Sequence, residues 1–336
     1  KNYLEEKGIP HTAAEIDRLV QGCTGIKRTT GQHPGGLVVV PDTMEIYDFC
    51  PVQHPADDVN SDTITTHFDF NSLHDRLVKL DILGHDDPTM LRMLKDITGI
   101  EPRDIPLDDP ETMAIFSRFH TLGLTAEQVG EKATGATGIP EFGTKFVRQM
   151  LEDTRPTTFS ELVRISGLSH GTDVWLGNAQ DLILSHTATL RECICCRDDI
   201  MLSLMQYGVP PKMSFTIMES VRKGKGLKPE MEEAMAEHEV PEWFCDSCRK
   251  IKYMFPKGHA VAYVTMAFRI AWFKVHIPEA YYATYFTVRA DDFDASLMLG
   301  GEKAVREQIA KLEAIEGKLP VKEKGILTIL EVILEM

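Results

Sequence analysis

The sequence of 336 residues lacks several features that would place a protein in a specialised class. It has no long hydrophobic run: the most apolar stretch, 260–275, is interrupted by Arg269 and is too short to span a bilayer. This stretch predicts a buried helix, and we expect no membrane partner. From the charged first residues we expect no secretory signal peptide, and because an initiator Met is also missing we expect the chain to start inside a longer protein. Internal repeats and low-complexity tracts are absent as well, which favours an ordinary globular protein.

Cysteine is scarce, with seven residues and no regular spacing. This pattern excludes a disulfide framework and predicts a reducing compartment, so we expect a cytoplasmic protein. Cys245 and Cys248 have the spacing of half a zinc site, and residues 193–196 contain three further thiols. Both groups lie among apolar residues, where free cysteine commonly serves as packing material. We therefore expect no zinc site.

Basic residues are too few to balance the acidic ones, and the formal net charge is −15. Nucleic-acid binding requires a positive surface, so the overall balance does not favour it. The charge is segregated, however, with basic runs at 222–228 and 249–252 and acidic runs at 104–111 and 230–239. The net charge therefore bears on solubility, whereas the basic runs indicate where an anionic partner would bind.

Helix and strand signals divide the chain into a small α/β part followed by a large helical part. Strands are predicted at 37–40, 64–70 and 77–83, and the last two are expected to pair as a hairpin that brings His67 and Asp69 near Asp81. After residue 83, capping signals predict helix starts. These signals are at Asp87, Asp109, Thr158, Asp198 and Pro229. A long helix over 259–276 ends at Pro278, and a final helix is predicted over 325–336.

The predicted strand at 77–83 carries the most informative polar residues. With a period of two, Lys79 and Asp81 share one face. The apolar residues expected to enter a core from the other face are Val78, Leu80 and Ile82. A carboxylate in an apolar strand is costly unless it is paired or bound to a cation. On pattern alone, a salt bridge with Lys79 and a ligand for two-metal phosphoryl transfer are equally favoured.

Two further segments could carry chemistry. Residues 167–171 match the G-x-S-x-G elbow of α/β-hydrolases, with Ser169 as the nucleophile. That elbow follows a strand, whereas this one follows a predicted helix, so a chance match is favoured and a serine hydrolase remains an alternative. Lys257 and His259 precede the long helix, whose N-terminal amides suit a phosphate group. The simpler interpretation of these two residues is a solvated surface.

Five long strings of the chain are distinctive. They are residues 27–36 (KRTTGQHPGG), 79–88 (KLDILGHDDP), 166–175 (SGLSHGTDVW), 196–201 (CRDDIM) and 255–260 (FPKGHA). Through these strings the chain resembles the PolC-type family of bacterial DNA polymerase III alpha subunits along almost its whole length. The resemblance implies an α/β palm portion of the nucleotidyltransferase, polymerase beta-like type, followed by a mainly α-helical fingers domain. It implies the end of a thumb at 1–25, palm at 26–95, fingers at 96–290, and the end of the fingers or start of a C-terminal region at 291–336.

The reaction that the resemblance implies is template-directed transfer of a deoxynucleotide from a dNTP to a primer 3′-hydroxyl, with two Mg²⁺ ions. Asp81 falls at the third metal-binding aspartate of the palm, and the family's other two acids lie before this chain begins. We therefore expect the fragment to be inactive alone. Lys79 and Arg28 would balance phosphate charge. The other residues expected at the nucleotide or phosphate site are His33, Ser169, His170, Arg197, Lys257 and His259.

Primer–template DNA is the expected macromolecular partner. Lys145 and Arg148 share a face of the helix predicted after Pro140, and the basic run contributes a second group of contacts. The residues of that group are Arg222, Lys223 and Lys225. Contacts with a sliding clamp and a replisome are expected outside this chain. A non-catalytic nucleic-acid-binding module is the third alternative for the fragment.

Overall fold

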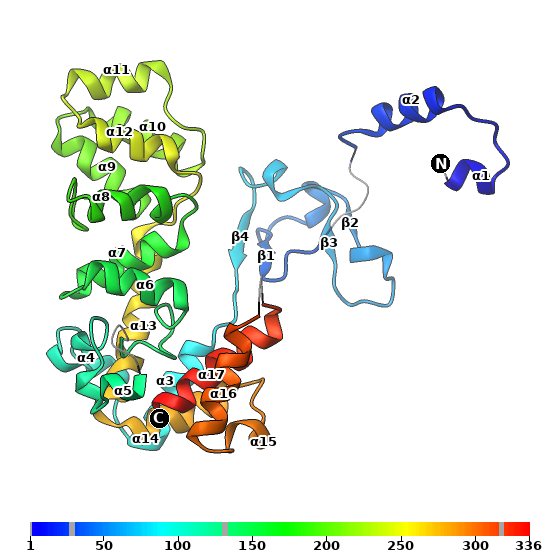
Figure 1. Cartoon of the computed structure of the whole chain (residues 1–336). Helices are drawn as coiled ribbons and strands as arrows, with labels where there is room; N and C mark the ends of the chain where they lie inside the picture. Colours follow the sequence, from blue (N-terminus) through cyan, green and yellow to red (C-terminus); the bar gives the residue numbers. More distant parts are fainter. Residues whose placement is uncertain (1, 27–30, 130–133, 316–318) are drawn as a thin grey trace. The chain divides into compact units, whose positions relative to one another are not determined.

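The computed structural model describes residues 2–26, 31–129, 134–315 and 319–336. The chain separates into two compact units, Lys1–Gly84 (unit 1) and His85–Met336 (unit 2). Figure 1 shows that, among the residues just given, unit 1 contains all the strands and unit 2 is built from helices.

Unit 1 starts with two helices, α1 (Asn2–Glu6) and α2 (Ala13–Cys23). The hydroxyl of Thr12 caps α2 by accepting a hydrogen bond from the amide of Glu15, at 3.3 Å. Neither helix has a buried residue, so the stability of α2 rests on its cap and on the Glu15–Arg18 contact rather than on a core.

The strands of unit 1 form two antiparallel pairs. β1 (Gly36–Val39) pairs with β4 (Val78–Asp81), and β2 (Val52–Gln53) pairs with β3 (Thr65–Thr66). The predicted hairpin between residues 64–70 and 77–83 is therefore wrong. The connection between these segments is not a hairpin loop: it starts with the 3-10 turn η3 (Phe70–Ser72) and continues as helical turns that bury Leu73 and Leu77 against Cys50.

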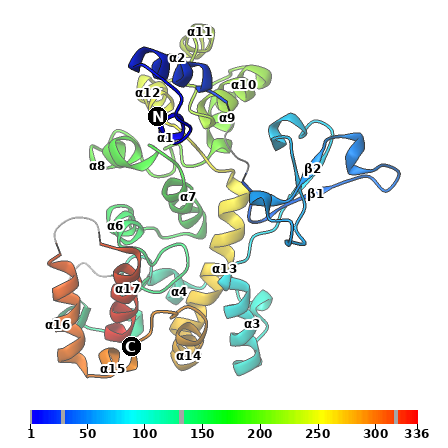
Figure 2. The ribbon, with the colours of Figure 1, turned by 90° about the vertical axis from the view of Figure 1, so that its right-hand side faces the viewer.

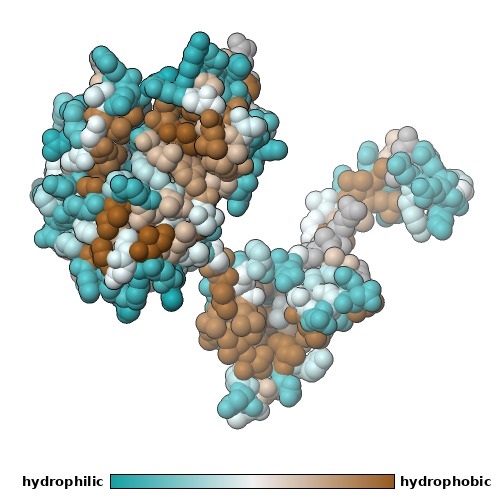
Figure 3. All heavy atoms as spheres, turned by 90° about the horizontal axis from the view of Figure 1, so that it is seen from below, coloured by the Kyte–Doolittle hydropathy of each residue, from teal (hydrophilic) through white to brown (hydrophobic). Residues whose placement is uncertain are grey.

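The two-stranded ribbon of β1 and β4 has one covered face and one open face. Val38 packs on the small core of Cys50, Leu73 and Leu77. On the opposite face, cross-strand pairing aligns Leu37 with Leu80 and Val39 with Val78. These four side chains are 54% (Leu37), 42% (Val39), 62% (Val78) and 46% (Leu80) exposed. Figure 3 shows apolar surface on the part of unit 1 that holds this ribbon.

The expectation that Val78, Leu80 and Ile82 enter a core is therefore wrong for this chain, because Ile82 is also exposed. The alternation itself is correct, since Lys79 and Asp81 do lie on the other face. Within unit 1 this apolar face stays largely uncovered, although its pattern is that of a face made for burial.

Unit 2 is helical, as predicted. Its helices are α3 (Asp86–Thr98), α4 (Pro110–Ala114), α5 (Ala126–Val129), α6 (Lys145–Thr154), α7 (Phe159–His170), α8 (Gln180–Leu184), α9 (Arg197–Gln206), α10 (Pro211–Arg222), α11 (Pro229–Glu237), α12 (Glu242–Lys250), α13 (Lys257–His276), α14 (Pro278–Val288), α15 (Ala295–Met298), α16 (Glu302–Glu313) and α17 (Val321–Glu335).

Most of the predicted helix starts are confirmed. The side chains of Asp109 and Thr158 accept the capping hydrogen bonds of α4 and α7, and Pro229 opens α11. The start of α3 differs, because His85 rather than Asp87 is its N-cap. Asp87 is instead buried and lies 3.2 Å from the guanidinium of Arg289, which follows α14.

The long helix α13 forms the centre of unit 2. Figures 1 and 2 both show it running through the unit, with α9–α12 towards one end and α14–α17 towards the other. It packs against α3, α4, α7 and α14, and side chains such as Val264, Phe268 and Ala271 are fully buried. This confirms the buried helix predicted from the apolar run. In the described parts of the chain, no helix meets the length and hydrophobicity needed to cross a membrane.

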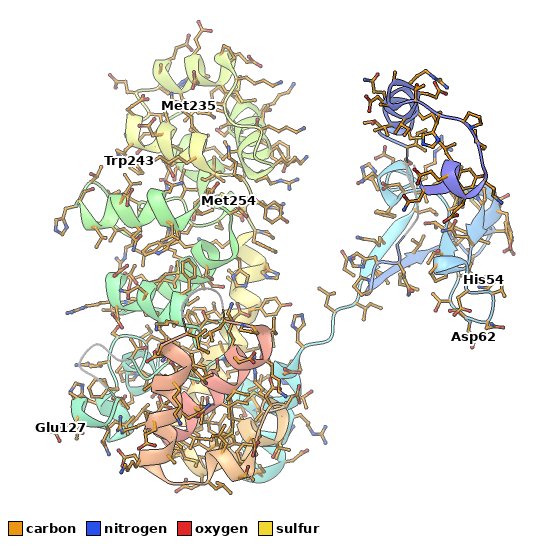
Figure 4. All side chains as sticks on the ribbon, turned by 45° about the vertical axis from the view of Figure 1, so that its right-hand side comes forward. His54, Asp62, Glu127, Met235, Trp243 and Met254 are labelled. Atoms are coloured by element: carbon orange, nitrogen blue, oxygen red, sulfur yellow. The ribbon has the colours of Figure 1, made fainter. Side chains whose placement is uncertain are left out.

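The core of unit 2 is continuous from α3 to α14. Met235, Trp243 and Met254, labelled in Figure 4 at the end that carries α11 and α12, belong to or pack on this core. A second, smaller core joins α15, α16 and α17 through Met298, Val305 and Leu330, and Phe286 contacts both cores.

Candidate nucleotide-binding and nucleic-acid sites

Asp81 is the last residue of β4, and its carboxylate lies 3.1 Å from the ammonium of Lys79. The structure thus contains the predicted salt bridge. The Asp81 side chain is nevertheless 52% exposed, and its cross-strand neighbour is Gly36, which has no side chain to cover it. The Lys79 ammonium also lies 5.3 Å from the centre of the Phe70 ring. The pair therefore leaves a carboxylate accessible next to a positioned cation.

The residues from His33 to Gly36 pack against the end of β4. The carbonyl of Gly35 accepts a hydrogen bond from the amide of Ile82 at 2.7 Å, and a Cβ atom on Gly35 would lie only 2.3 Å from the Ile82 carbonyl oxygen. Only glycine allows this approach. His33 Nδ1 accepts a hydrogen bond from the Gly35 amide at 3.2 Å, so His33 lies near the strand end that carries Asp81. Arg28 lies outside the described residues.

The residues present fit only part of a divalent metal site. Mg²⁺ binds through one or two carboxylates together with waters or phosphate oxygens, and Asp81 offers one such carboxylate. The other two expected neighbours are used elsewhere: Asp69 caps η3, and the ring of His67 contacts Gln53. Within the described residues, no group of three or more histidine, cysteine or acidic side chains is placed to hold a metal ion.

In unit 2, the end of α7 and the start of α13 bring together a group of rings and one carboxylate, here termed the histidine cluster: Glu141, His170, Phe255, His259 and Tyr263. The ring centres of Phe255 and His259 are 4.9 Å apart, and those of His259 and Tyr263 are 4.5 Å apart. His170 lies 5.6 Å from both Phe255 and His259. Two of the predicted nucleotide-site residues, His170 and His259, are therefore neighbours.

The predicted Ser169–His170 loop is the last turn of α7. Gly167 lies inside that helix, where a Cβ atom would be 2.5 Å from the Cys195 carbonyl oxygen. The Ser169 hydroxyl donates to the Ser166 carbonyl at 2.9 Å. The match to a hydrolase elbow therefore lacks the strand before it, which supports the interpretation that it arose by chance.

Ser169, His170 and Glu141 nonetheless have the connectivity of a serine–histidine–acid triad. Ser169 Oγ is 3.2 Å from His170 Nδ1, and the Glu141 carboxylate is 2.9 Å from His170 Nε2. The Ser166 carbonyl is closer to Nδ1, at 2.6 Å, and a carbonyl only accepts hydrogen bonds. Nδ1 therefore carries a proton and cannot take one from Ser169, so the triad has no general base.

The start of α13 already holds a carboxylate. Asp198 accepts a hydrogen bond from the Lys257 amide at 2.6 Å, which occupies part of the predicted phosphate site at this helix start. The Lys257 ammonium is 3.9 Å from the buried Asp199 carboxylate, a loose contact that leaves it available. No carboxylate in the described residues pairs with the Arg197 guanidinium, which belongs to the first residue of α9.

The predicted DNA-contacting residues differ in how far internal carboxylates neutralise them. Lys145 and Arg148 of α6 lie 3.3 Å and 2.6 Å from the carboxylates of Glu313 and Glu331, which ties α6 to α16 and α17. Arg222 and Lys223 both pair with Glu219, and the hydrogen bond from Arg222 lowers the pKa of Glu219 to about 2.

Lys225 is exposed and has no ion pair among the described residues. It follows Gly224, whose positive φ of 69° and close approach to Lys252 require glycine: a Cβ atom there would be 2.4 Å from the Lys252 carbonyl oxygen. The exposed Lys252 therefore belongs to the same surface as Lys225. Arg249, from the second basic run, is enclosed by Glu232, Glu242 and Asp246.

The cysteines of the two possible zinc half-sites are buried. Burial raises the pKa of the Cys193 and Cys196 thiols to about 12. The absence of zinc remains a prediction. Glu141, by contrast, was not predicted from the sequence, because no local pattern links it to His170.

Comparison with known proteins identifies the family. Residues 2–84 match the family described as the bacterial DNA polymerase III alpha NTPase domain, and residues 87–241 match the bacterial DNA polymerase III alpha subunit finger domain. The chain therefore belongs to the bacterial DNA polymerase III alpha family.

Its similarity is to the PolC type of that family. Proteins named DNA polymerase III PolC-type are 62% identical in Clostridium perfringens and 63% identical in Bacillus subtilis and Staphylococcus saprophyticus, in each case over all 336 residues. The chain spans 23% of the length of each of these relatives.

Proposed function

We propose that this chain is part of a replicative DNA polymerase that transfers deoxynucleotides from dNTPs to a primer 3′-hydroxyl under the direction of a template. The observation that carries the proposal is the overall identity of 62–63%, over all 336 residues of the chain, to proteins named DNA polymerase III PolC-type. Residues 1–25 would end a thumb, 26–95 form part of a palm, 96–290 the fingers, and 291–336 the end of the fingers or the start of a C-terminal region.

The palm assignment is supported by the open face of the β1–β4 ribbon. Its apolar pairs, Leu37 with Leu80 and Val39 with Val78, have the pattern of a sheet face that packs in a core. A palm of the nucleotidyltransferase type would cover this face and extend the ribbon with strands from a longer protein. The ribbon is then the part of the palm that carries one catalytic carboxylate.

In this proposal Asp81 is the catalytic residue of the chain and one ligand of Mg²⁺, with Lys79 and His33 beside it. Bound Mg²⁺ would offset the negative charge that develops on the phosphates during transfer. Lys79 positions the Asp81 carboxylate and adds positive charge. Arg28 is proposed to balance the negative charge of the phosphates. One carboxylate does not hold two ions, so the chain alone is expected to be inactive.

On the fingers, Arg197, Lys257 and His259 are proposed to face the triphosphate of the incoming nucleotide. Arg197 and Lys257 suit this role because their positive charges are only weakly neutralised. No carboxylate among the described residues pairs with Arg197, and the contact of Lys257 with Asp199 is loose. Ser169 and His170 support the pocket from α7. Lys225 and Lys252 are proposed to contact primer–template DNA, whereas Arg148 has an internal role. Sliding-clamp and replisome contacts would come from other parts of a full-length protein.

The test is Asp81→Asn in a full-length polymerase that carries this segment. The substitution keeps the shape of the side chain and removes the charge that holds a cation, so primer extension should fall to background while primer–template binding is retained. Asp62→Asn is the matched control, because Asp62 is an exposed acid of the same unit (Figure 4). Retention of most of the extension rate would show that Asp81 serves only its salt bridge with Lys79.

A non-catalytic nucleic-acid-binding module is the second candidate for the isolated chain, favoured because the described residues contain no group of three or more side chains placed to hold a metal ion. Primer extension by the chain alone, with Mg²⁺ and all four dNTPs, should match a buffer control, whereas primer–template binding should be measurable. Extension that survives repurification would contradict the requirement for further acids.

A further inference from the structure

We propose that Glu141 is a positioning residue that holds His170 as a fixed, doubly protonated imidazolium, so that His259 is the histidine that meets the triphosphate. The inference rests on the proposed function of the fingers and deepens it, because it assigns different tasks to two adjacent histidines. Its first part, that Glu141 keeps His170 doubly protonated, concerns the chain without any ligand and can be tested separately from the proposed function.

The hydrogen bonds of His170 define its protonation. Nδ1 lies 2.6 Å from the Ser166 carbonyl oxygen, and Nε2 lies 2.9 Å from the Glu141 carboxylate. Both partners accept hydrogen bonds and neither donates one when the carboxylate is ionised, so both ring nitrogens must carry hydrogen. The hydrogen bond to Glu141 raises the pKa of His170 and outweighs the opposing effect of burial. With both N–H groups used, His170 contributes charge but has no free donor for a phosphate.

The backbone conformation at Glu141, which directs its side chain to His170, is unusual. Its φ of 67° is in the left-handed region, which residues with a side chain rarely adopt. The preceding segment, 134–140, is entirely buried and therefore fixes the direction of the Glu141 side chain. Backbone strain of this kind persists where the surrounding structure imposes it, and it occurs most often at functional sites.

His259 is in the opposite situation. In the described chain its ring nitrogens make no hydrogen bond, and its ring lies between Phe255 and Tyr263. Burial and the positive charge of His170 lower the pKa of His259, and His85 acts in the same direction, whereas Glu141 opposes them. The hydroxyl of Tyr263, whose ring contacts His259, lies 2.7 Å from His85 Nε2. His259 is therefore neutral at pH 7 without ligand and can take up a proton when an anion arrives.

The first experiment is a pH titration of the chain labelled with ¹³C at histidine Cε1 and observed by NMR. His170→Gln and His259→Gln identify the two signals by their loss. The His170 signal should keep the imidazolium chemical shift to well above pH 6.5, and in Glu141→Gln it should titrate near the usual histidine pKa of about 6.5. Glu230→Gln, which removes an exposed acid on α11, is the control and should change neither signal.

A His170 signal that titrates near pH 6.5 in the unmodified chain would overturn the proposal, and this outcome does not depend on the folding of any variant. A rise in the His170 signal's pKa in Glu141→Gln would overturn it as well, because the carboxylate would then not be the group that holds the proton.

The second experiment measures tripolyphosphate affinity between pH 6 and pH 8 for the unmodified chain, His259→Gln and Glu141→Gln. The affinity ratio of the unmodified chain to His259→Gln cancels the protonation of the ligand itself. This ratio should increase as the pH falls, by at most about tenfold per pH unit for one linked proton. A ratio that is independent of pH would show that His259 does not take up the proton.

Glu141→Gln distinguishes the two possible states of His170. If His170 kept its charge after loss of the acid, the anion should bind more tightly. At pH 8, where the neutral form of His170 prevails in Glu141→Gln, we expect equal or weaker binding, because His170 loses its proton together with the charge of the carboxylate, and tighter binding at pH 8 would contradict the proposal. Absence of tripolyphosphate binding by the unmodified chain would overturn the proposed function of this pocket, whereas the NMR titration would still decide the Glu141–His170 pair.

Discussion

The ammonium of Lys274 lies 2.5 Å from the carboxylate of Glu335, and both side chains are buried. Lys274 is on α13 and Glu335 is the last residue of α17, so the pair ties the C-terminal helix to the central helix of unit 2. The same ammonium donates hydrogen bonds to the carbonyls of Gly135 and Thr137, at 2.8 Å and 2.7 Å. It thereby holds the segment that continues to Glu141 and presents that carboxylate to His170.

Lys274→Met should lower the free energy of unfolding by roughly 3–5 kcal/mol, because it leaves a buried carboxylate without its counter-charge. Lys274→Met combined with Glu335→Leu should recover part of that loss, since no buried charge then lacks its partner, whereas the carbonyls of Gly135 and Thr137 still lose their donor. Chemical denaturation of the two single variants and the double variant measures the coupling. Lys303→Met, at an exposed position on α16, is the control and should have little effect. Additive losses in the double variant would show that the two side chains do not depend on each other.

The open face of the β1–β4 ribbon predicts a difference between the chain alone and a full-length polymerase. In the chain alone, Leu37→Ser with Leu80→Ser should change the free energy of unfolding by no more than about 0.5 kcal/mol per site, because both side chains are already exposed. In a full-length protein the same pair should be strongly destabilising if further strands cover this face. Leu73→Ser, which removes a buried side chain of unit 1, should be destabilising in both settings. Equal, small effects of the pair in both proteins would contradict the palm assignment.

The basic residues after α10 should contribute unequally to DNA binding. Replacing Arg222, Lys223 and Lys225 together with Ala should weaken binding about equally on different DNA sequences. Most of that change should come from Lys225, because Arg222 and Lys223 are paired with Glu219. Lys225→Ala should flatten the plot of log affinity against log salt concentration by about 0.7–0.9, the value for one phosphate contact. Fluorescence anisotropy at several salt concentrations measures this slope, and a larger effect of Arg222→Ala would mean that DNA displaces Glu219.

Ser169 should not react with a fluorophosphonate probe. Its hydroxyl donates to the Ser166 carbonyl, and the neighbouring His170 Nδ1 carries a proton, so nothing activates it as a nucleophile. Mass spectrometry of the treated chain, compared with Ser169→Ala, tests this directly. Labelling at Ser169 that the alanine variant abolishes would support the hydrolase alternative.

Much of unit 2 could be predicted because its helices start with local contacts. The caps at Asp109 and Thr158 join a side chain to an amide only three residues away, so the neighbouring sequence contains all the information needed. The pairing of β4 was mispredicted for the opposite reason. Its partner β1 lies some 40 residues earlier, and the alternation of Val78 to Asp81 is compatible with any partner strand.

By itself, the sequence determined the family of this protein, the helical character of the fingers, and Asp81 as the candidate acid on a strand face with Lys79. These depend on strings of residues and on periodicity along the chain. Only the tertiary structure decided that Gly36 lies across from Asp81, that Glu219 neutralises Arg222, and that His170 and His259 differ. The contact between Lys274 and Gly135 joins residues 139 positions apart. Side-chain charge and protonation depend on such distant neighbours, because burial and electrostatic interactions act through space and not along the chain.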